Sequence, residues 1–218
     1  ITLDGAPIYN TSHFLGFFSV FNSEAIEDMQ IYKGSIPARY GGRLSSVMDI
    51  SSRRSNRDSI SGSGGISPVT SKLTLEIPVF KGKGGIMLGG RTTYSNWILK
   101  RINNAEFNQN RISFSDVILR HDYDINSKNK ITASGYYSKD DFRMSSDTLF
   151  SVSDFRYENK AASFGFLHQF SEHLSSSLSL LYSGYRYELR YDASPANAFL
   201  QDFDISEGTV KAELNYSR

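Results

Sequence analysis

The sequence predicts a mainly β protein in which about eight antiparallel strands follow a more irregular N-terminal region. Three observations lead to this prediction. Apolar and polar residues alternate over many stretches after residue 60, as expected of strands with one apolar and one wet face. Turn-forming residues separate these stretches. The composition agrees, because 39% hydrophobic residues is a low share for a globular core, whereas 13% aromatic residues is a high one.

The segment 72–80 is the clearest of the predicted strands. Its odd-numbered positions from 73 to 79 are apolar, whereas Lys72, Thr74 and Glu76 lie on the opposite face. The predicted strands are 60–67, 72–80, 85–93, 112–125, 130–144, 159–170, 174–192 and 208–218. Longer excursions are predicted at 94–111, where SNWILKRI suits two helical turns, at 145–157 and at 193–207.

The connections between these strands alternate between short and long. Transmembrane β-barrels have this arrangement, with tight turns at one rim and larger loops at the other. Strand 174–192 adds a length argument, because its apolar face from Leu174 to Tyr182 covers nine positions, close to the roughly 9 to 11 residues of a membrane-crossing strand. Beyond Gly184 the apolar residues change phase, which predicts a strand leaving the bilayer through an aromatic girdle, with a bulge at the glycine. A soluble antiparallel sandwich would show the same alternation.

Composition excludes several other classes of protein. The net charge of +1 argues against a dedicated nucleic-acid binder, which would carry a clustered basic excess. The absence of cysteine rules out disulfides and Cys-based metal sites within these residues. No stretch approaches the roughly 20 apolar residues of a membrane-spanning helix, and no leader segment opens the sequence. Because the sequence begins and ends inside predicted strands, we expect it to be a piece of a longer protein.

The segment 24–50, EAIEDMQIYKGSIPARYGGRLSSVMDI, predicts a short helical turn, a strand ending at Lys33-Gly34, a compact segment and a second strand. Glycine at the turns accepts positive φ without a Cβ clash. Together with LDGAP at 3–7, this segment resembles the plug domain of TonB-dependent outer-membrane receptors. Its residues are most similar to receptors of the Bacteroidetes type. In that family an (V/I)DG-P strand, a DAIE-type strand and a YG…GG strand follow one another at about these intervals.

The resemblance implies a fold: a partial plug domain followed by about eight antiparallel strands of an incomplete transmembrane β-barrel. Residues 1–52 would be the C-terminal part of the plug, 53–59 a polar linker, and 60–218 the N-terminal strands of the barrel. Plugged barrels of this kind have about 22 strands. We therefore expect the native state to require the rest of the chain, and an isolated fragment to pair through its open edges.

The loop YNTSHFLGFFSVFN, at 9–22, supplies the candidate ligand-binding residues. The resemblance implies that plug loops of this kind can face the extracellular side and meet a ligand. The polar candidates are Asn10, Ser12 and His13, and the apolar or stacking candidates are Phe14, Phe17 and Phe18. The alternative is that these Phe residues pack the plug and that His13 is a satisfied turn residue.

Four charged residues are candidates for polar contacts between plug and wall: Arg39, Arg43, Lys72 and Glu76. Such contacts would hold the plug yet remain breakable, because solvated ion pairs are worth roughly 0 to 1 kcal/mol. Surface salt bridges without a gating role are the alternative. The serine- and arginine-rich linker at 53–59 predicts a solvated connector rather than a phosphate site.

Nothing in the sequence predicts an enzyme, a cofactor or a metal site. The four histidines lack metal-ligand spacing, and no nucleophile elbow or phosphate-binding loop occurs. The GSGG run at 62–65 precedes a predicted strand rather than a helix, so a dinucleotide site is not expected. Asp140-Asp141 is expected near a loop, solvated, with at most weak affinity for a cation.

The resemblance implies gated uptake of an extracellular ligand in the bacterial outer membrane. TonB would act through a segment absent from this sequence, outer-membrane lipid would surround the barrel, and a surface lipoprotein is a further partner the family allows. The ligand could be a siderophore, cobalamin, a glycan or a peptide. The alternatives are an outer-membrane receptor with a sensing or structural role, and a soluble ligand-binding β-protein.

Overall fold

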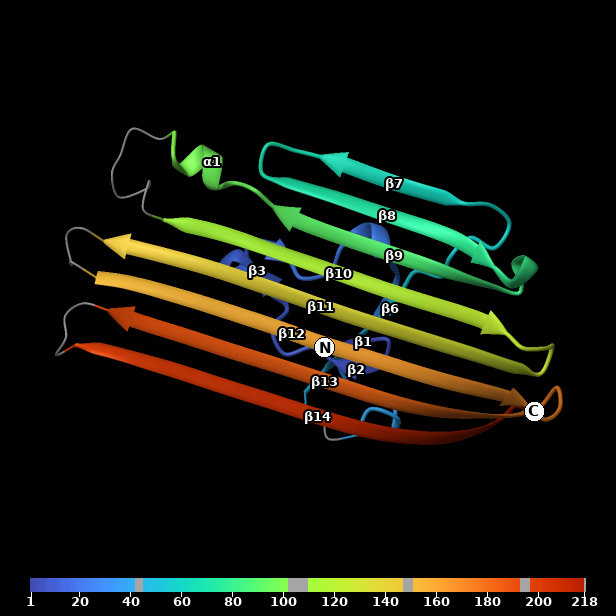
Figure 1. Ribbon diagram of the computed structural model, residues 1–218. Helices are drawn as coiled ribbons and strands as arrows, with labels where there is room; N and C mark the ends of the chain where they lie inside the picture. Colours follow the sequence, from blue (N-terminus) through green and yellow to red (C-terminus); the bar gives the residue numbers. More distant parts are fainter. Residues whose placement is uncertain (42–44, 102–109, 147–150, 193–196, 218) are drawn as a thin grey trace.

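The computed structural model describes residues 1–41, 45–101, 110–146, 151–192 and 197–217. Its main feature is an eight-stranded antiparallel sheet in which the strands lie side by side in chain order, from β7 to β14 (Figure 1). These strands are β7 (Ser61–Ile66), β8 (Thr70–Val79), β9 (Gly84–Thr93), β10 (Arg111–Asp124), β11 (Asn129–Ser146), β12 (Ser151–Gln169), β13 (Leu174–Asp192) and β14 (Ala198–Tyr216). The prediction of a mainly β fold with eight antiparallel strands is confirmed.

Two of the predicted excursions are wrong in extent. Strand β12 begins at Ser151 and β14 at Ala198, so most of 145–157 and of 193–207 is strand. In these stretches charged residues alternate with aromatic ones, and the charges conceal the strand period. The excursion at 94–111 contains the short helix α1 (Asn96–Leu99) rather than two full helical turns. No helix of the described residues is long and apolar enough to cross a membrane.

The N-terminal unit, residues 1–52, forms a second, smaller set of strands. Its four-stranded sheet has the order β2-β1-β6-β5, and only the β1–β6 pair is parallel. A hairpin of β3 and β4 lies beside it. The elements are β1 (Thr2–Leu3), β2 (Ala6–Pro7), β3 (Ser12–His13), η1 (Phe14–Gly16), β4 (Phe18–Ser19), η2 (Ser23–Ala25), β5 (Ile26–Tyr32) and β6 (Val47–Ser52). The predicted order within 24–50, a helical turn followed by two strands, is confirmed.

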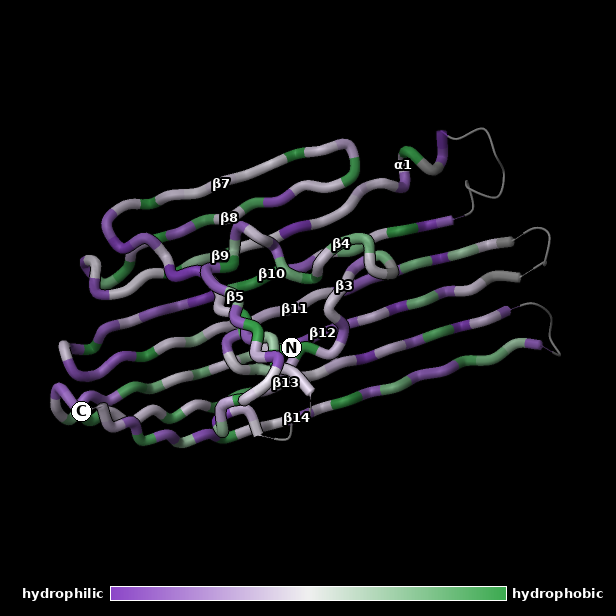
Figure 2. Tube along the Cα trace, turned by 180° about the vertical axis from the view of Figure 1, so that it is seen from behind, coloured by the Kyte–Doolittle hydropathy of each residue, from purple (hydrophilic) through white to green (hydrophobic). Residues whose placement is uncertain are grey.

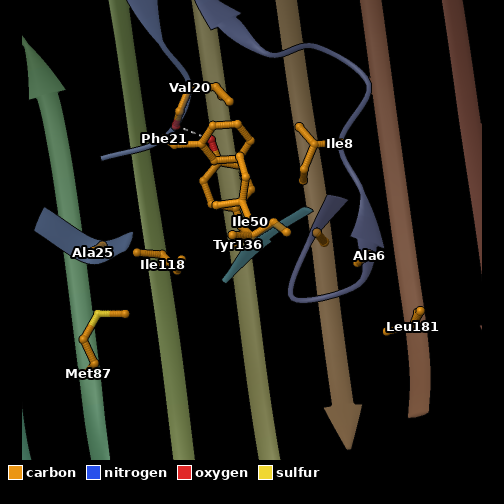
Figure 3. Packing of buried hydrophobic residues seen from close by; sticks show 12 residues of the cluster. Ala6, Ile8, Val20, Phe21, Ala25, Ile50, Met87, Ile118, Tyr136 and Leu181 are labelled. Atoms are coloured by element: carbon orange, nitrogen blue, oxygen red, sulfur yellow. Dashed lines mark hydrogen bonds between the residues drawn. The ribbon is translucent and has the colours of Figure 1, made fainter. Parts of the chain in front are cut away.

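The N-terminal unit packs against one face of the eight-stranded sheet, here called the inner face (Figure 2). The contact has a compact apolar core (Figure 3). From the unit come Leu3, Ala6, Ile8, Val20, Phe21, Ala25 and Ile50, and from the sheet come Met87, Ile118, Tyr136, Ala161 and Leu181. The hydroxyl of Tyr136 donates a hydrogen bond of 3.0 Å to the carbonyl of Val20. These buried residues place the segment 1–52 on the sheet.

The opposite, outer face carries exposed apolar side chains from six strands, here called the outer belt. Its members include Leu73, Ile77, Leu88, Val117, Leu119, Phe164, Leu178, Leu180, Tyr182, Val210 and Leu214. Large apolar side chains exposed side by side mark a surface that normally has a partner. Beside the apolar core, the inner face carries buried polar side chains beneath the N-terminal unit, among them Thr74, Asp116 and Asp122.

Strand β13 continues past Gly184 without the predicted bulge. The ladder pairs Gly184 with Lys160 on one side and Ser206 on the other, with no register shift. Because no residue is inserted, the side-chain alternation persists. Tyr185 and Tyr187 therefore lie on the inner face, with the buried Leu181, rather than in a girdle on the outer face.

Candidate functional site

Polar side chains fasten the N-terminal unit to the inner face at several places, and three of these contain pairs of oppositely charged residues. Each of the three joins residues far apart in the chain: His13 with Asp140, Asp4 with Arg120, and Glu24 with Lys72. The apolar core lies among them. This interface is the candidate functional site.

The first place is a buried cluster around His13. Its Nδ1 lies 2.7 Å from Oδ2 of Asp140, and its Nε2 lies 3.4 Å from Oδ2 of Asp116. The ring stacks on Phe114, with centroids 4.3 Å apart and planes at 6°. Strand β3 ends at His13, and Phe14, which has a φ of 50°, reverses the chain directly after it. The reversal leaves the backbone N–H of Phe14 to donate to the other oxygen of Asp140, at 3.3 Å.

The charges in this cluster balance when His13 is protonated. Burial opposes protonation, but the hydrogen bonds and negative charges of Asp116 and Asp140 outweigh it, so the pKa of His13 is raised from 6.5. The guanidinium of Arg91 donates from Nε to Asp116 at 2.8 Å and from a terminal nitrogen to the carbonyl of Ser19 at 2.7 Å. Two cations thus face two carboxylates, which is the arrangement that allows charge to be buried.

The second place is built on the turn at Asp4. Asp4 and Gly5 have φ values of 48° and 85°, so the turn uses the left-handed region. The carboxylate of Asp4 accepts from the backbone N–H of Ser52 at 3.0 Å and from its hydroxyl at 2.6 Å. Arg120 of β10 donates from Nη1 to the same carboxylate at 3.0 Å. Its Nε and Nη2 each donate to the carboxylate of Asp122 at 2.9 Å. Asp4, in the turn between β1 and β2, therefore links β6 of the unit to β10 of the sheet.

The third place is more exposed and involves two residues predicted as wall contacts. Lys72 lies 2.5 Å from Glu24 of the unit, and the hydroxyl of Ser63 donates to Glu24 at 2.8 Å. The hydrogen bond from Lys72 is the main cause that lowers the pKa of Glu24. Glu76 instead accepts from the backbone N–H of Asn56, in the predicted linker, at 2.6 Å.

The other two predicted wall contacts are placed differently. The guanidinium of Arg39 donates to the hydroxyl of Tyr32 at 3.1 Å and lies over the ring of Tyr40, so these contacts stay within the N-terminal unit. Arg43 lies outside the described residues. The structure therefore places Lys72 and Glu76, both on the sheet, in contact with Glu24 and Asn56 of the first 59 residues. The contacts given for Arg39 do not reach the sheet.

The predicted ligand-binding residues gather at one end of the unit. Asn10 exchanges two hydrogen bonds of 3.1 Å with the buried Asn159 of β12. The Asn10 side chain also accepts from the backbone N–H of Ser12. His13 is completely buried, whereas Phe17 is 76% exposed.

Phe14 and Phe18 touch both the hairpin and the sheet. Phe14 lies 4.9 Å from Phe17 and 5.9 Å from Phe142, measured between ring centroids. Phe18 lies 5.3 Å from Phe114. Their role in ligand binding remains a prediction, as does that of Asn10 and Ser12.

Sequence reasoning missed Asp4, Asp116 and Arg120, and misjudged Asp140. The expectation of a solvated Asp140 is wrong: its side chain is 1% exposed, because it lies within β11 under the hairpin. Asp4 carried a signal, since it belongs to the Asp-Gly pair of the first motif. Arg120 and Asp116 carried none, because their partners are remote in sequence.

Among the described residues, no group of three or more His, Asp or Glu side chains is arranged to hold a metal ion. The polar contacts that the described residues make at this interface are ion pairs and hydrogen bonds. Such contacts can hold the N-terminal unit on the sheet, and their polar groups can bind water when the two parts separate.

Comparisons with known proteins concern the fold. No protein-family model matches the sequence, and no curated protein matches it. The structure is similar to the crystal structure of the siderophore receptor PiuA from Acinetobacter baumannii, with a TM-score of 0.55 and 13% sequence identity. The match covers 87% of this chain and 32% of that receptor, so the chain spans about a third of its length. The chain thus has the fold of one part of such a receptor.

Proposed function

We propose that this chain forms the plug and the first barrel strands of a TonB-dependent outer-membrane receptor, of the type found in Bacteroidetes, that takes up an extracellular ligand. Three ordered sequence motifs and the fold shared with PiuA support the proposal. Its partners would be TonB, outer-membrane lipid, the ligand and, in some systems, a surface lipoprotein. The ligand classes compatible with the motifs are a siderophore, cobalamin, a glycan and a peptide.

The observation that carries the proposal is the two-faced sheet. Its outer belt exposes apolar side chains such as Leu178, Leu180 and Val210 with no protein layer over them in the described part of the chain. A sandwich would cover such a face with a second sheet, whereas a barrel strand turns it toward lipid. The N-terminal unit lies on the opposite face, where a plug would lie.

The nature of the interface supports a unit that moves. Charged groups regain hydration when Asp4, His13 or Glu24 leaves its partner, so separation costs less than breaking an apolar contact of equal area. The apolar core of the interface is one cluster of buried residues, and these polar clusters lie around it. An interface of this composition stays closed until a force is applied, and can then open.

Cross-linking tests whether the unit must move. No cysteine occurs in these 218 residues, so Glu24→Cys with Lys72→Cys introduces one reactive pair at a contact that is already partly exposed. The protein is made in its own cell, and a short reducible bis-methanethiosulfonate reagent joins the two thiols. Growth is followed on a medium where deletion of the gene slows growth.

We expect the cross-linked double variant to grow as slowly as the deletion strain, and a reductant to restore growth. Each single variant treated with the same reagent is the matched control and should grow normally. Normal growth with complete cross-linking would overturn gated uptake. Absence of the protein from the outer-membrane fraction would overturn the receptor assignment itself.

A further inference from the structure

The inner face of the sheet changes character beyond the N-terminal unit. Where β11 to β14 extend past Asn159 and Ser183, their inner positions carry aromatic rings, here called the aromatic wall. The wall consists of Phe142, Phe155, Tyr157, Tyr185, Tyr187, Tyr191, Phe199 and Phe203. The strand register places these rings on one face, because Tyr157 pairs with Tyr187 and Tyr187 with Phe203.

The rings form a continuous row across four strands. Centroids are 6.1 Å apart between Phe142 and Tyr157, 5.3 Å between Tyr157 and Tyr187, and 5.9 Å between Tyr187 and Phe203. The last pair is stacked at 18°. A second pair, Tyr191 and Phe199, is stacked at 5.2 Å. Rings therefore follow one another at about the spacing of neighbouring strands.

In the described part of the chain, the N-terminal unit contacts the aromatic wall only at the end nearest to Phe142 and Tyr185, and the rings farther from the unit remain at least partly exposed. Phe14 extends the row from Phe142, and Tyr9 lies 6.1 Å from Tyr185. Farther out, Phe199 and Phe203 are 48% and 56% exposed. The aromatic wall is thus next to the end of the unit that holds the candidate ligand-binding residues.

Charge is confined to the other face of these strand segments. Directly behind the wall, the outer face carries cross-strand ion pairs: Arg156 with Glu188 at 3.7 Å, and Arg186 with Asp202 at 2.8 Å. The inner positions between Asn159 and Ser153, between Ser183 and Tyr191, and between Phe199 and Ile205 contain no charged residue. The nearest inner carboxylates are already engaged, Asp140 with His13 and Glu207 with the hydroxyl of Tyr9.

We propose that the aromatic wall binds a neutral oligosaccharide, a proposal that rests on the receptor function above and names its ligand class. The face of an aromatic ring is electron-rich and attracts the weakly positive C–H groups on the flat side of a sugar ring. The Tyr hydroxyls and the amide of Gln201 supply hydrogen bonds for sugar hydroxyls beside these rings. A row of rings that crosses four strands suits an extended chain of sugar rings.

The same features disfavour the other ligand classes. An anionic metal chelate needs cations to meet it, and the described inner positions of the wall offer none. A cationic ligand would need free carboxylates as well as rings. A peptide bound as an added strand needs a free sheet edge, whereas Tyr157 and Tyr187 lie on β12 and β13, which are paired on both sides.

Direct binding measurements on the receptor as the cell makes it test this proposal. The protein is purified in lauryldimethylamine oxide, which has no sugar headgroup, and titrated with neutral hexose and pentose oligosaccharides of four to eight residues. Oligogalacturonates of equal length are the charged comparison. Tyr187→Ala and Phe203→Ala remove wall rings, Tyr187→Phe removes one hydroxyl, and Tyr182→Ala, on the outer face of the same strand, is the matched control.

We expect at least one neutral oligosaccharide to bind, at least tenfold more weakly in Tyr187→Ala and Phe203→Ala, and equally well in Tyr182→Ala. Three results would overturn the proposal: no neutral oligosaccharide binds, oligogalacturonate binds more tightly than the neutral oligosaccharides, or the affinity is unchanged in Tyr187→Ala and Phe203→Ala. The last result would mean that another part of the chain covers the wall. None of these outcomes affects the cross-linking test or the membrane fractionation, so the receptor assignment would fail or stand separately.

Discussion

The ring nitrogen Nδ1 of His13 lies 2.7 Å from the carboxylate of Asp140, 127 positions away in the chain, and neither side chain reaches solvent. One bridge thus joins the hairpin of the N-terminal unit to β11. Through Nε2 the same ring faces Asp116 of β10, which also holds Arg91 of β9. Three neighbouring strands and the hairpin therefore depend on one imidazole.

The first prediction is that attachment of the hairpin weakens at alkaline pH. The pKa of His13 is raised in the folded state, so its contribution is fully present below about 6.5 and is lost as pH rises through the raised value. The charged groups around the ring are Asp140, Asp116 and, through Asp116, Arg91. Hydrogen exchange of residues 12–19, corrected for intrinsic rates, should be faster at pH 9 than at pH 6.

The matched control for pH is His13→Gln, which keeps a hydrogen-bonding side chain but cannot titrate. Exchange in this variant should no longer depend on pH in the same window. Equal protection of the wild-type hairpin at both pH values would contradict the prediction.

The second prediction concerns loss of the imidazole. His13→Ala leaves the buried carboxylate of Asp140 without its cation, and breaking a buried pair from one side costs about 3 to 5 kcal/mol. We expect the free energy of opening of residues 1–52, from native-state hydrogen exchange, to fall by an amount in this range. His173→Ala, in an exposed turn, should change it by less than about 0.5 kcal/mol. A similar effect of both variants would show that His13 is not specifically engaged.

The strand pattern was predictable where alternation involved aliphatic residues and serine. Strand β13 begins and ends at the predicted residues, 174 and 192, because leucines alternate with serines and a polar turn precedes them. The starts of β12 and β14 were missed because their outer positions are charged, as at Arg156 and Asp202. A pattern of charge against aromatic ring has the same period of two, and indicates a strand with water on the outside.

The site was less predictable than the fold, for a physical reason. Local sequence can place His13 in a turn, but its partner Asp140 is fixed only when β11 is laid beside β10 and under the hairpin. The contact is thus set by tertiary register, which is not visible in any window of sequence. The role of Asp4 could have been predicted, because an Asp at a left-handed turn has a carboxylate that needs hydrogen-bond donors.

The third prediction is that Asp4 and Arg120 are energetically coupled. Arg120 donates to Asp4 and to the carbonyl of Ser52, so either single substitution leaves buried polar groups unpaired. Asp4→Ala and Arg120→Met should each destabilise the N-terminal unit, and the double variant should cost less than their sum. Native-state hydrogen exchange should give a coupling energy of about 0.5 to 3 kcal/mol. Strict additivity would mean that the contact contributes nothing beyond its separate parts.

The fourth prediction uses two adjacent glycines that face opposite sides of β9. A Cβ on Gly89 would lie 2.9 Å from Cγ2 of Ile118 and 3.0 Å from Cβ of Ala25, whereas a Cβ on Gly90 would meet only a backbone oxygen at 3.7 Å. Gly89→Val should therefore push the N-terminal unit away from the sheet, at a cost of about 1 to 3 kcal/mol.

Gly90→Ala is the matched control, since it adds a side chain one residue away on the outer face. It should leave the opening free energy of residues 1–52 within about 0.5 kcal/mol of wild type, and hydrogen exchange on both variants measures the difference. If Gly89→Val were equally silent, the closeness of Ala25 to β9 would not be a feature of the folded protein. If it weakens the unit but leaves the protected amides of β9 and β10 unchanged, the unit can separate from an intact sheet. That separation is the physical requirement for a plug that opens without unfolding its barrel.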